Sequence, residues 1–220
     1  MKAYTSNNIR NIAVLGHGGK GKTTLCEAML YIAGASDRLG RVADGNTVLD
    51  FDSEEKRRKS SVSSAIAALE WDNTKLNIID APGLFDFEGG AAEAVRAAEA
   101  VLIVTSAGSG VDVGTEKAFR AAEKKGAAKF FAVTKTDSDH RNFYKTFDAL
   151  KEVYGNKLCP TIIPYMEGNI TKCYVNLMTG MAFSYDENGK ATKVPVPEDS
   201  VIEEMTSAFM EAVATTDDAL

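Results

Sequence analysis

One short segment constrains the fold of this chain more than any other feature. It reads Gly16-His17-Gly18-Gly19-Lys20-Gly21-Lys22-Thr23 and fits the spacing G-x-x-x-x-G-K-[ST]. The glycines allow backbone N–H groups to turn inward around phosphate oxygens. The apolar run Ile12–Leu15 before the segment predicts a buried strand, and a helix is expected from about Lys22 to Ala33. A strand, a glycine-rich turn and a helix N-terminus in this order predict a phosphate-binding loop.

The side chains at the end of this segment have specific expected roles. Lys22 would reach the β- and γ-phosphates of a nucleoside triphosphate, and the Thr23 hydroxyl would bind magnesium. Thr24 follows in the first turn of the expected helix and is included among the nucleotide-contacting residues. Lys20 is a further cation in the loop, for which a phosphate contact and a solvated side chain are both open.

A second candidate motif follows a predicted hairpin. The segments Ala65–Trp71 and Leu76–Asp80 read as two strands joined by an Asp72-Asn73 turn. The second strand ends in Asp80-Ala81-Pro82-Gly83. A carboxylate at Asp80 can hold magnesium through a water, and the N–H of Gly83 can be offered to a γ-phosphate. Taken alone, Asp-x-Pro-Gly is a common turn, and its place one hairpin after the phosphate loop gives it this meaning.

A third candidate motif could recognise the base of the bound nucleotide. Thr134-Lys135-Thr136-Asp137 ends the predicted strand Phe130–Thr134. The Asp137 carboxylate can accept two hydrogen bonds from the N1–H and 2-amino groups of guanine, which adenine cannot supply. The stem of Lys135 can lie across the base. Its place in the strand order therefore favours guanine, whereas a lone Lys-x-Asp would be an ordinary surface turn.

Strands and helices alternate through most of the chain. Helices are expected at Ala91–Ala100, Thr115–Lys125 and about Arg141 to Tyr154, with a strand at Val101–Thr105. This order predicts an α/β fold in three layers, with a mostly parallel sheet covered by helices on both faces. Residues 36–64 show no sustained periodicity, and a stretch of this kind within a compact domain is usually functional or mobile.

The rhythm changes near the C-terminal third. Thr161–Pro164 reads as a further edge strand, and Cys173–Leu177 and Met181–Tyr185 as short antiparallel strands. Asn188-Gly189 is a hairpin turn, and Ser200 with Glu203 predicts a capping box for a final helix. Two domains are therefore expected: residues 1–166 as the nucleotide-binding part and residues 167–220 as a small α+β part.

Composition narrows the class of protein. There are 25 lysines and arginines against 31 acidic residues, a net charge of −6, so no broad basic face for DNA is expected. The N-terminal apolar run is too short for a signal peptide, and no run nears the roughly 18 apolar residues of a membrane span. Three cysteines without a Cys-x-x-Cys pair suggest reduced core thiols. A cytoplasmic protein, and a monomer, is expected.

Taken in order, these motifs resemble the GTPase domain of elongation factor G, and most closely the branch of elongation factor G-like proteins. Arg38–Thr47 and Glu55–Val62 look like that branch's first switch, and Asp80–Phe87 looks like its second switch. The resemblance runs from about Asn8 to the C-terminus. It implies a P-loop GTPase fold with a small inserted, incomplete subdomain, GTP or GDP and Mg²⁺ as ligands, and the ribosome as partner.

At three positions the chain departs from the family pattern. Ser61 aligns with the magnesium-binding threonine of the first switch, and Thr134 aligns with the asparagine that begins the guanine motif. Leu84 aligns with the histidine that orients the attacking water, and an apolar side chain cannot hold water by hydrogen bonding. The resemblance assigns catalysis to the region of Lys22, Gly83 and Leu84. Three readings stay open: a slowly hydrolysing GTPase switch, a GTP-binding regulatory module without hydrolysis, and an ATPase of the same fold.

Overall fold

The chain forms two compact units in the computed structural model. They comprise Met1–Lys135 and Thr136–Leu220. The structure describes residues 2–136, 142–155, 158–168, 170–186 and 189–215, so Asp137 and Asn188 lie outside the described residues. The expected domain boundary at 166/167 lies within the second unit, and the assignment of residues 167–220 as an inserted subdomain stays a prediction.

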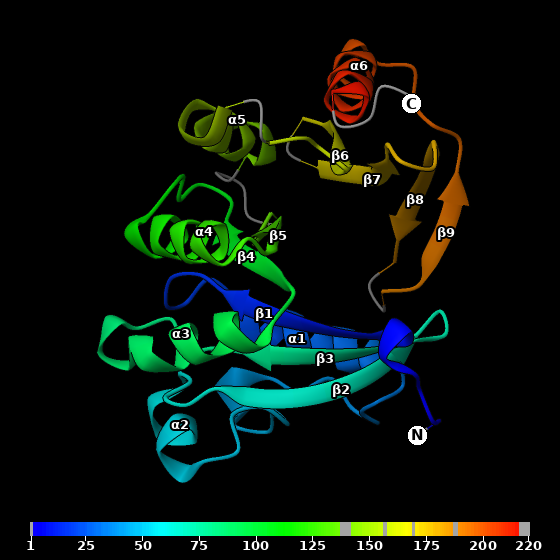
Figure 1. Ribbon diagram of the computed structural model, residues 1–220. Coiled ribbons are helices and arrows are strands. Elements are labelled where there is room, and N and C mark those ends of the chain that lie inside the picture. Colours follow the sequence, from blue (N-terminus) through cyan, green and yellow to red (C-terminus); the bar gives the residue numbers. More distant parts are fainter. Residues whose placement is uncertain (1, 137–141, 156–157, 169, 187–188, 216–220) are drawn as a thin grey trace. The chain divides into compact units, whose positions relative to one another are not determined.

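The first unit contains a five-stranded sheet in the order β2-β3-β1-β4-β5 (Figure 1). Its strands are β1 (Ile9–Leu15), β2 (Ala65–Trp71), β3 (Thr74–Asp80), β4 (Ala100–Ser106) and β5 (Ala128–Thr134). All neighbouring pairs are parallel except β2 and β3, which form the predicted hairpin. The expected α/β architecture with a mostly parallel sheet is therefore confirmed.

Helices cover both faces of this sheet. They are α1 (Lys22–Ile32) on one face, and α3 (Glu88–Ala97) and α4 (Val113–Lys125) on the other, while α2 (Ser53–Arg58) belongs to the segment between α1 and β2. Consecutive side chains of a strand point to opposite faces. Val14 of β1 packs in a buried cluster with Cys26 and Leu30 of α1. The next residue, Leu15, lines a cavity on the other face together with residues of α3 and α4, including Ala118. The sheet is thus the middle of three layers.

Residues 36–64 are more structured than the sequence suggested. They contain α2, which begins after Asp52 with a complete capping box: the Asp52 carboxylate accepts from the N–H of Glu54, and the Glu55 carboxylate accepts from the N–H of Asp52. Glu27 of α1 is fully buried and accepts from the N–H groups of Val48 and Leu49. Six residues are too few to show helical periodicity, so the expectation of an irregular segment was wrong here.

The second unit is a small α+β structure. Its elements are α5 (Phe143–Tyr154), β6 (Ile162–Glu167), β7 (Ile170–Asn176), β8 (Met181–Tyr185), β9 (Ala191–Val194) and α6 (Ser200–Ala214). The four strands form an antiparallel sheet in sequence order, and its core includes Ile163, Val175 and Ile202. The expected strand at Thr161–Pro164 is an edge strand, but of this second sheet. The final helix is capped by Asp199, whose carboxylate accepts from the N–H of Val201, so the predicted Ser200 cap was wrong.

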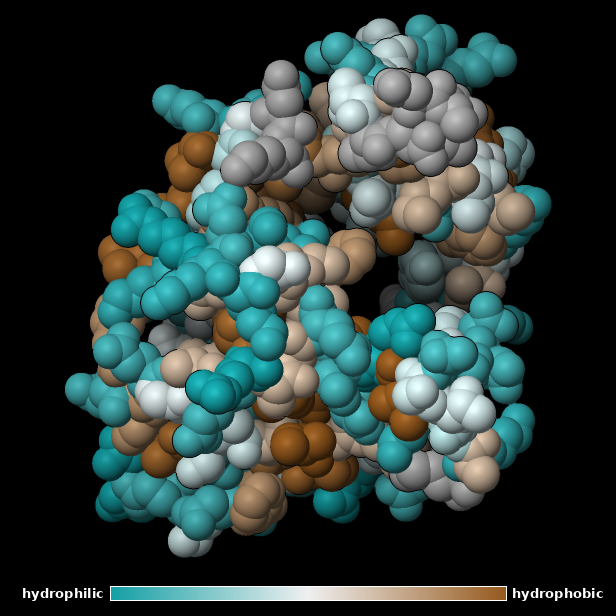
Figure 2. All heavy atoms as spheres, in the orientation of Figure 1, coloured by the Kyte–Doolittle hydropathy of each residue, from teal (hydrophilic) through white to brown (hydrophobic). Residues whose placement is uncertain are grey.

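The surface carries scattered apolar groups among polar ones. On the face shown in Figure 2, hydrophilic side chains predominate and hydrophobic ones form small, separate patches. Within the described ranges, no helix combines the length and the apolarity that crossing a membrane requires.

Candidate functional site

The predicted phosphate-binding loop, residues 16–23, is called the P-loop below. It connects β1 to α1, and its backbone has a conformation that only glycine adopts easily. Gly16, Gly19 and Gly21 have φ angles of 139°, 74° and 90°. A Cβ on Gly16 would lie 2.2 Å from the carbonyl oxygen of Val104 in β4. The positive φ angles and this close approach explain why the loop is rich in glycine. They leave backbone N–H groups free of side-chain cover at the start of α1.

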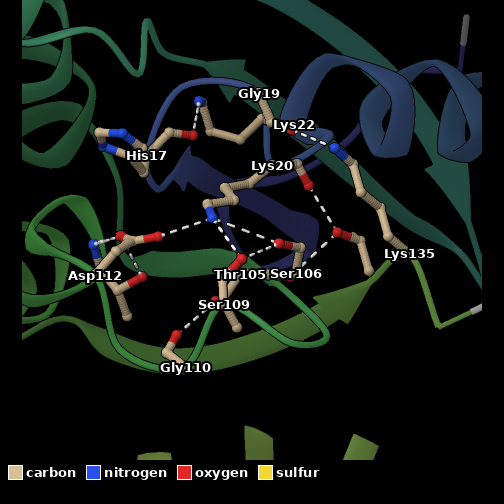
Figure 3. A network of polar contacts seen from close by, with 12 residues as sticks. His17, Gly19, Lys20, Lys22, Thr105, Ser106, Ser109, Gly110, Asp112 and Lys135 are labelled. Carbon is tan, nitrogen blue, oxygen red and sulfur yellow. Dashed lines mark hydrogen bonds and ion pairs between the residues drawn. The ribbon is translucent and has the colours of Figure 1, made fainter. Parts of the chain in front are cut away.

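Lys22 lies inside this loop rather than in solvent. Its side chain is buried, with 6% of the residue exposed, and its ammonium donates to the carbonyl oxygen of His17 over 3.2 Å (Figure 3). Burial lowers the pKa of Lys22, and the nearby Asp80 carboxylate opposes that effect. An ammonium held this way, with one carbonyl as acceptor, can donate to a phosphate oxygen brought into the loop.

Lys20 points to a different set of partners. Its Nζ lies 3.2 Å from Oδ2 of Asp112, the residue that caps α4, and donates to Oγ of Ser109 over 2.7 Å (Figure 3). Its side chain is only 14% exposed, so it is not the solvated lysine that the sequence left open. These contacts attach the P-loop to the segment between β4 and α4.

The end of β5 is also bound to the P-loop. Oγ1 of Thr134 donates to the carbonyl oxygens of Lys20 and Thr105, at 2.7 and 3.1 Å. The exposed Lys135, in a left-handed conformation with φ 55°, donates from Nζ to the carbonyl oxygen of Gly19 over 2.6 Å. The Thr134 hydroxyl therefore binds the backbone of the P-loop through the carbonyl oxygen of Lys20. Asp137, the expected base-reading residue, lies outside the described residues.

Two hydroxyls and two carboxylates meet beside the first turn of α1. Oγ1 of Thr23 donates to Oδ2 of Asp80 over 2.6 Å, and Oγ of Ser61 donates to Oδ1 of Asp50 over 2.7 Å. The two hydroxyl oxygens are 3.1 Å apart. Each hydroxyl has a single proton. With both protons directed to the carboxylates, the oxygens of Thr23 and Ser61 face each other with lone pairs only.

The carboxylates of this cluster are strongly affected by burial. Asp80 and Asp50 are 1% and 4% exposed, and Oδ1 of Asp80 and Oδ2 of Asp50 have no hydrogen-bond partner among the described residues. Burial raises the pKa of Asp80 to about 7, although the Thr23 hydroxyl and the Lys22 ammonium oppose the shift. Burial also raises the pKa of Asp50. Orphaned carboxylate oxygens in such a place are unusual in folded proteins and accept a cation readily.

The loop after β3, which contains Gly83 and Leu84, also contacts the P-loop. A Cβ on Gly83 would lie 2.2 Å from Nζ of Lys22 and 2.7 Å from the backbone nitrogen of Gly18. A Cβ on Gly18 would lie 2.9 Å from Cδ2 of Leu84, so the side chain of Leu84 rests against the P-loop. Leu84 is 37% exposed, and the ring of Phe85 lies 5.4 Å from that of His17. Leu84 and Phe85 also line a separate, mainly apolar cavity of about 440 Å³.

A second cavity, of about 220 Å³, is lined largely by polar residues and is called the polar cavity below. Most of the predicted site residues line it. It is lined by Gly18, Gly19, Gly21, Lys22, Thr23, Thr24, Val42, Asp50, Lys59, Ser60, Ser61, Gly83 and Lys135. The predicted residues that the structure describes but that do not line it are Gly16, His17, Lys20, Asp80, Leu84 and Thr134. Asp50 and Lys59 do line it, and sequence reasoning missed both. Asp50 was missed because it falls in the segment without periodicity, although a lone aspartate among apolar neighbours in Leu49-Asp50-Phe51 was a usable signal.

The cavity, together with the Asp80 carboxylate that accepts from Thr23 beside it, is rich in oxygen donors. Among residues that the structure describes, no three or more histidine, cysteine, aspartate or glutamate side chains gather in a way that could hold a metal ion by themselves. The hydroxyls of Thr23 and Ser61 and the carboxylates of Asp80 and Asp50 are hard oxygen donors. Magnesium is typically bound by one or two carboxylates together with waters and substrate phosphates, and this set is of that kind.

Known proteins resemble this chain over nearly its whole length. Residues 7–216 match the family described as Elongation factor Tu GTP binding domain. An elongation factor G-like protein of Mycobacterium tuberculosis (strain H37Rv) is 34% identical over 206 residues, covering 93% of this chain and 28% of that protein. Elongation factor G of Mycoplasma genitalium is 30% identical, covering 97% and 32%. A crystal structure from Thermus thermophilus matches with a TM-score of 0.90 and 35% identity, covering 96% of this chain and 32% of that one. The chain thus spans about a third of the length of these relatives.

Proposed function

This chain belongs to the family of elongation factor Tu GTP-binding domains, and we propose that it is the GTP-binding, slowly GTP-hydrolysing switch of an elongation factor G-like translation factor. The resemblance to elongation factor G that the motifs indicated is confirmed by the relatives. One observation supports the proposal most directly: the P-loop, Ser61 of the first switch and Gly83 of the second switch line one cavity.

In this proposal the phosphates lie in the P-loop. The N–H groups of Gly18, Gly19 and Gly21 and the start of α1 surround them, and Lys22 donates to the β- and γ-phosphates. The hydrogen bond from the Lys22 ammonium to the carbonyl oxygen of His17, itself a P-loop residue, supports this role. Gly83 offers its N–H to the γ-phosphate, and the absence of a Cβ there leaves room for Lys22.

Mg²⁺ would be held by the hydroxyls of Thr23 and Ser61, with Asp80 and Asp50 behind them. Two aspartate oxygens lack a hydrogen-bond partner among the residues that the structure describes, and they and the facing lone pairs of the two hydroxyls fit a divalent cation. When bound, Mg²⁺ neutralises charge that develops on the β- and γ-phosphate oxygens. Because Ser61 belongs to the first switch, its contact with Mg²⁺ would make the ordered conformation of that switch depend on the bound triphosphate.

Guanine would be recognised at the end of β5. Lys135 lies beside the P-loop and can cover the base with its stem, while Thr134 fixes the P-loop backbone in place of the family asparagine. Asp137 is proposed to accept from N1–H and the 2-amino group of guanine. Adenine lacks both donors, so this one carboxylate would set the preference for GTP over ATP.

Hydrolysis in this proposal is slow because Leu84 replaces a water-orienting histidine. A leucine against the P-loop excludes water from that side and provides no hydrogen bond to hold it in line. This observation also favours a second candidate function, a GTP-binding regulatory module with little or no hydrolysis. Turnover of radiolabelled GTP with and without ribosomes distinguishes the two, since the regulatory module shows no phosphate release in either condition.

The role in translation is proposed from the names of the relatives. Proteins named elongation factor G and elongation factor G-like protein match this chain, so we propose that it acts in translation, on the ribosome. The cytoplasmic location and the monomeric state are proposed from the sequence. In this view residues 1–166 form the G domain and residues 167–220 belong to a subdomain inserted in it.

Nucleotide competition tests the base assignment. Binding of a fluorescent GDP analogue should be displaced by GDP and GTP at concentrations at least about a hundredfold below those needed for ADP or ATP, because adenine leaves the carboxylate unpaired. Asp137→Asn should weaken GDP binding and improve binding of xanthosine diphosphate. Equal displacement by ADP and GDP would support an ATPase of the same fold and overturn the proposal.

A further inference from the structure

The first-switch helix ends at a lysine in an unusual backbone conformation. Lys59 follows α2 with φ 53° and ψ 41°, in the left-handed region, and its N–H donates to the carbonyl oxygen of Glu55. A glycine would adopt this conformation without cost, whereas a residue with a Cβ does not. Four non-glycine residues have positive φ among those described, and two of these, Asp72 and Asn73, form the hairpin turn that such side chains tolerate.

The other two are both lysines, and both border the same cavity. Lys135 and Lys59 line the polar cavity of about 220 Å³ that contains the P-loop. Lys135 lies beside Gly19, whose carbonyl oxygen accepts a hydrogen bond from the lysine ammonium. Lys59 lines the cavity together with Ser61, which follows it by two residues in the chain. The Ser61 hydroxyl lies 3.1 Å from the Thr23 hydroxyl. Lysines are thus held in a strained conformation at two places on the rim of one anion-sized cavity.

The charge of Lys59 is not compensated locally. In the described part of the chain its ammonium has no hydrogen bond and no ion pair, and the residue is exposed. The acids of α2 are already used: Glu54 pairs with Arg57 and Arg58, and Glu55 accepts from backbone N–H groups. A free cation at the edge of a cavity that also contains Lys22 makes that cavity suited to a ligand with several negative charges.

We infer that Lys59 binds the terminal phosphate of the bound nucleoside triphosphate from the first-switch side, so that the first switch discriminates triphosphate from diphosphate by a charge contact as well as through Ser61. This inference rests on the proposed function. Lys59 neighbours Ser61 and lines the same cavity as Gly83 and Lys22, which approach each other closely. A diphosphate has no group at that end, so the contact is made only in the triphosphate state.

A glycine substitution separates the two effects of Lys59. Lys59→Gly should leave the melting temperature of the nucleotide-free chain unchanged or raise it, because the left-handed conformation suits glycine. The same variant should bind a non-hydrolysable GTP analogue about tenfold more weakly, and GDP within about twofold of the parent, measured by calorimetry with Mg²⁺. Lys59→Arg should retain most of the analogue affinity.

Lys56→Ala is the matched control, because it removes one exposed positive charge from the same helix away from the cavity lining. It should leave both affinities within about twofold of the parent. The inference is overturned if Lys59→Gly binds the analogue as the parent does, if GDP and analogue weaken equally, or if Lys56→Ala produces the same loss. A parent that binds neither nucleotide overturns the proposed function itself.

Discussion

A Cβ atom on Gly83 would lie 2.2 Å from Nζ of Lys22, so the second-switch loop and the P-loop approach each other as closely as they do only because residue 83 is glycine. Gly83→Ala should therefore push the loop away from the P-loop. We expect a loss of stability of about 1–3 kcal/mol from overpacking. Binding of a GTP analogue should weaken more than binding of GDP, because the loop can then no longer approach a γ-phosphate.

Gly89→Ala provides the control for that substitution. Gly89 lies in α3, and a Cβ there would meet nothing within 4 Å. This variant should be neutral or more stable by about 0.5–1 kcal/mol, since alanine favours helix over glycine. Urea denaturation and calorimetric titration of both variants make the comparison. Equal stability of the Gly83 and Gly89 variants would show that the approach to Lys22 is not a tight one.

Asp80 should make the metal-free protein less stable as pH rises. Its pKa is raised to about 7 by burial, with Asp50 and Glu27 adding to the shift and Thr23 and Lys22 opposing it. The unfolded value is about 3.9, so the folded state holds this proton more tightly between these two pH values. Stability from this group is present at low pH and falls by up to about 1.4 kcal/mol per pH unit towards pH 7.

Asp80→Asn imitates the protonated carboxyl and should remove that slope. In EDTA, the variant should be similar to the parent near pH 3.5, below the unfolded pKa of about 3.9, and should become progressively more stable than the parent up to pH 8, as measured by urea denaturation. Added Mg²⁺ should stabilise the parent at pH 8 and leave the variant unchanged, because the cation binds the ionised carboxylate. Parallel pH profiles for the two proteins would contradict the burial argument.

Thr134→Val tests how the end of β5 holds the P-loop. The substitution keeps the shape of the side chain but removes the hydroxyl that donates to the carbonyl oxygens of Lys20 and Thr105. The free energy of unfolding should fall by about 0.5–1.5 kcal/mol, and nucleotide affinity a fewfold, because the P-loop backbone loses a fixed contact. Thr134→Ser retains the hydroxyl and should behave as the parent in both measurements.

The alternation of strands and helices predicted the parallel sheet, and the glycine-rich motif predicted the turn between β1 and α1, because its spacing encodes local backbone geometry. Features set by distant contacts were harder to predict. Lys20 reads as a surface charge until Asp112 and Ser109, far along the chain, are placed beside it. The strand Ile162–Glu167 shows which residues alternate but not which sheet they join, and its partner in the structure is β7. Helix α2 was missed by periodicity, although Asp52 followed by Glu55 was a readable start signal.

Leu84 is the position most informative about hydrolysis. Its side chain rests against Gly18 of the P-loop and is 37% exposed, so a different side chain can be accommodated there. Attack on the γ-phosphate requires a water held in line, and Phe85 beside it packs on His17 and provides no hydrogen bond. Leu84→His should therefore raise single-turnover GTP hydrolysis with saturating ribosomes by about 10²–10⁴-fold, the range of a positioned acid–base group.

The same variant should bind GDP as the parent does, because Leu84 does not line the cavity that contains Lys22, Thr23 and Ser61. Leu84→Met serves as the control, since it changes the shape of the side chain without adding a hydrogen-bonding group to hold water. Phosphate release from parent, Leu84→His and Leu84→Met is compared in one experiment, with ribosomes added, using a protein of the length of the elongation factor G relatives that includes this chain. If the parent already hydrolyses GTP rapidly and histidine adds nothing, another group positions the water, and the role assigned to Leu84 is wrong.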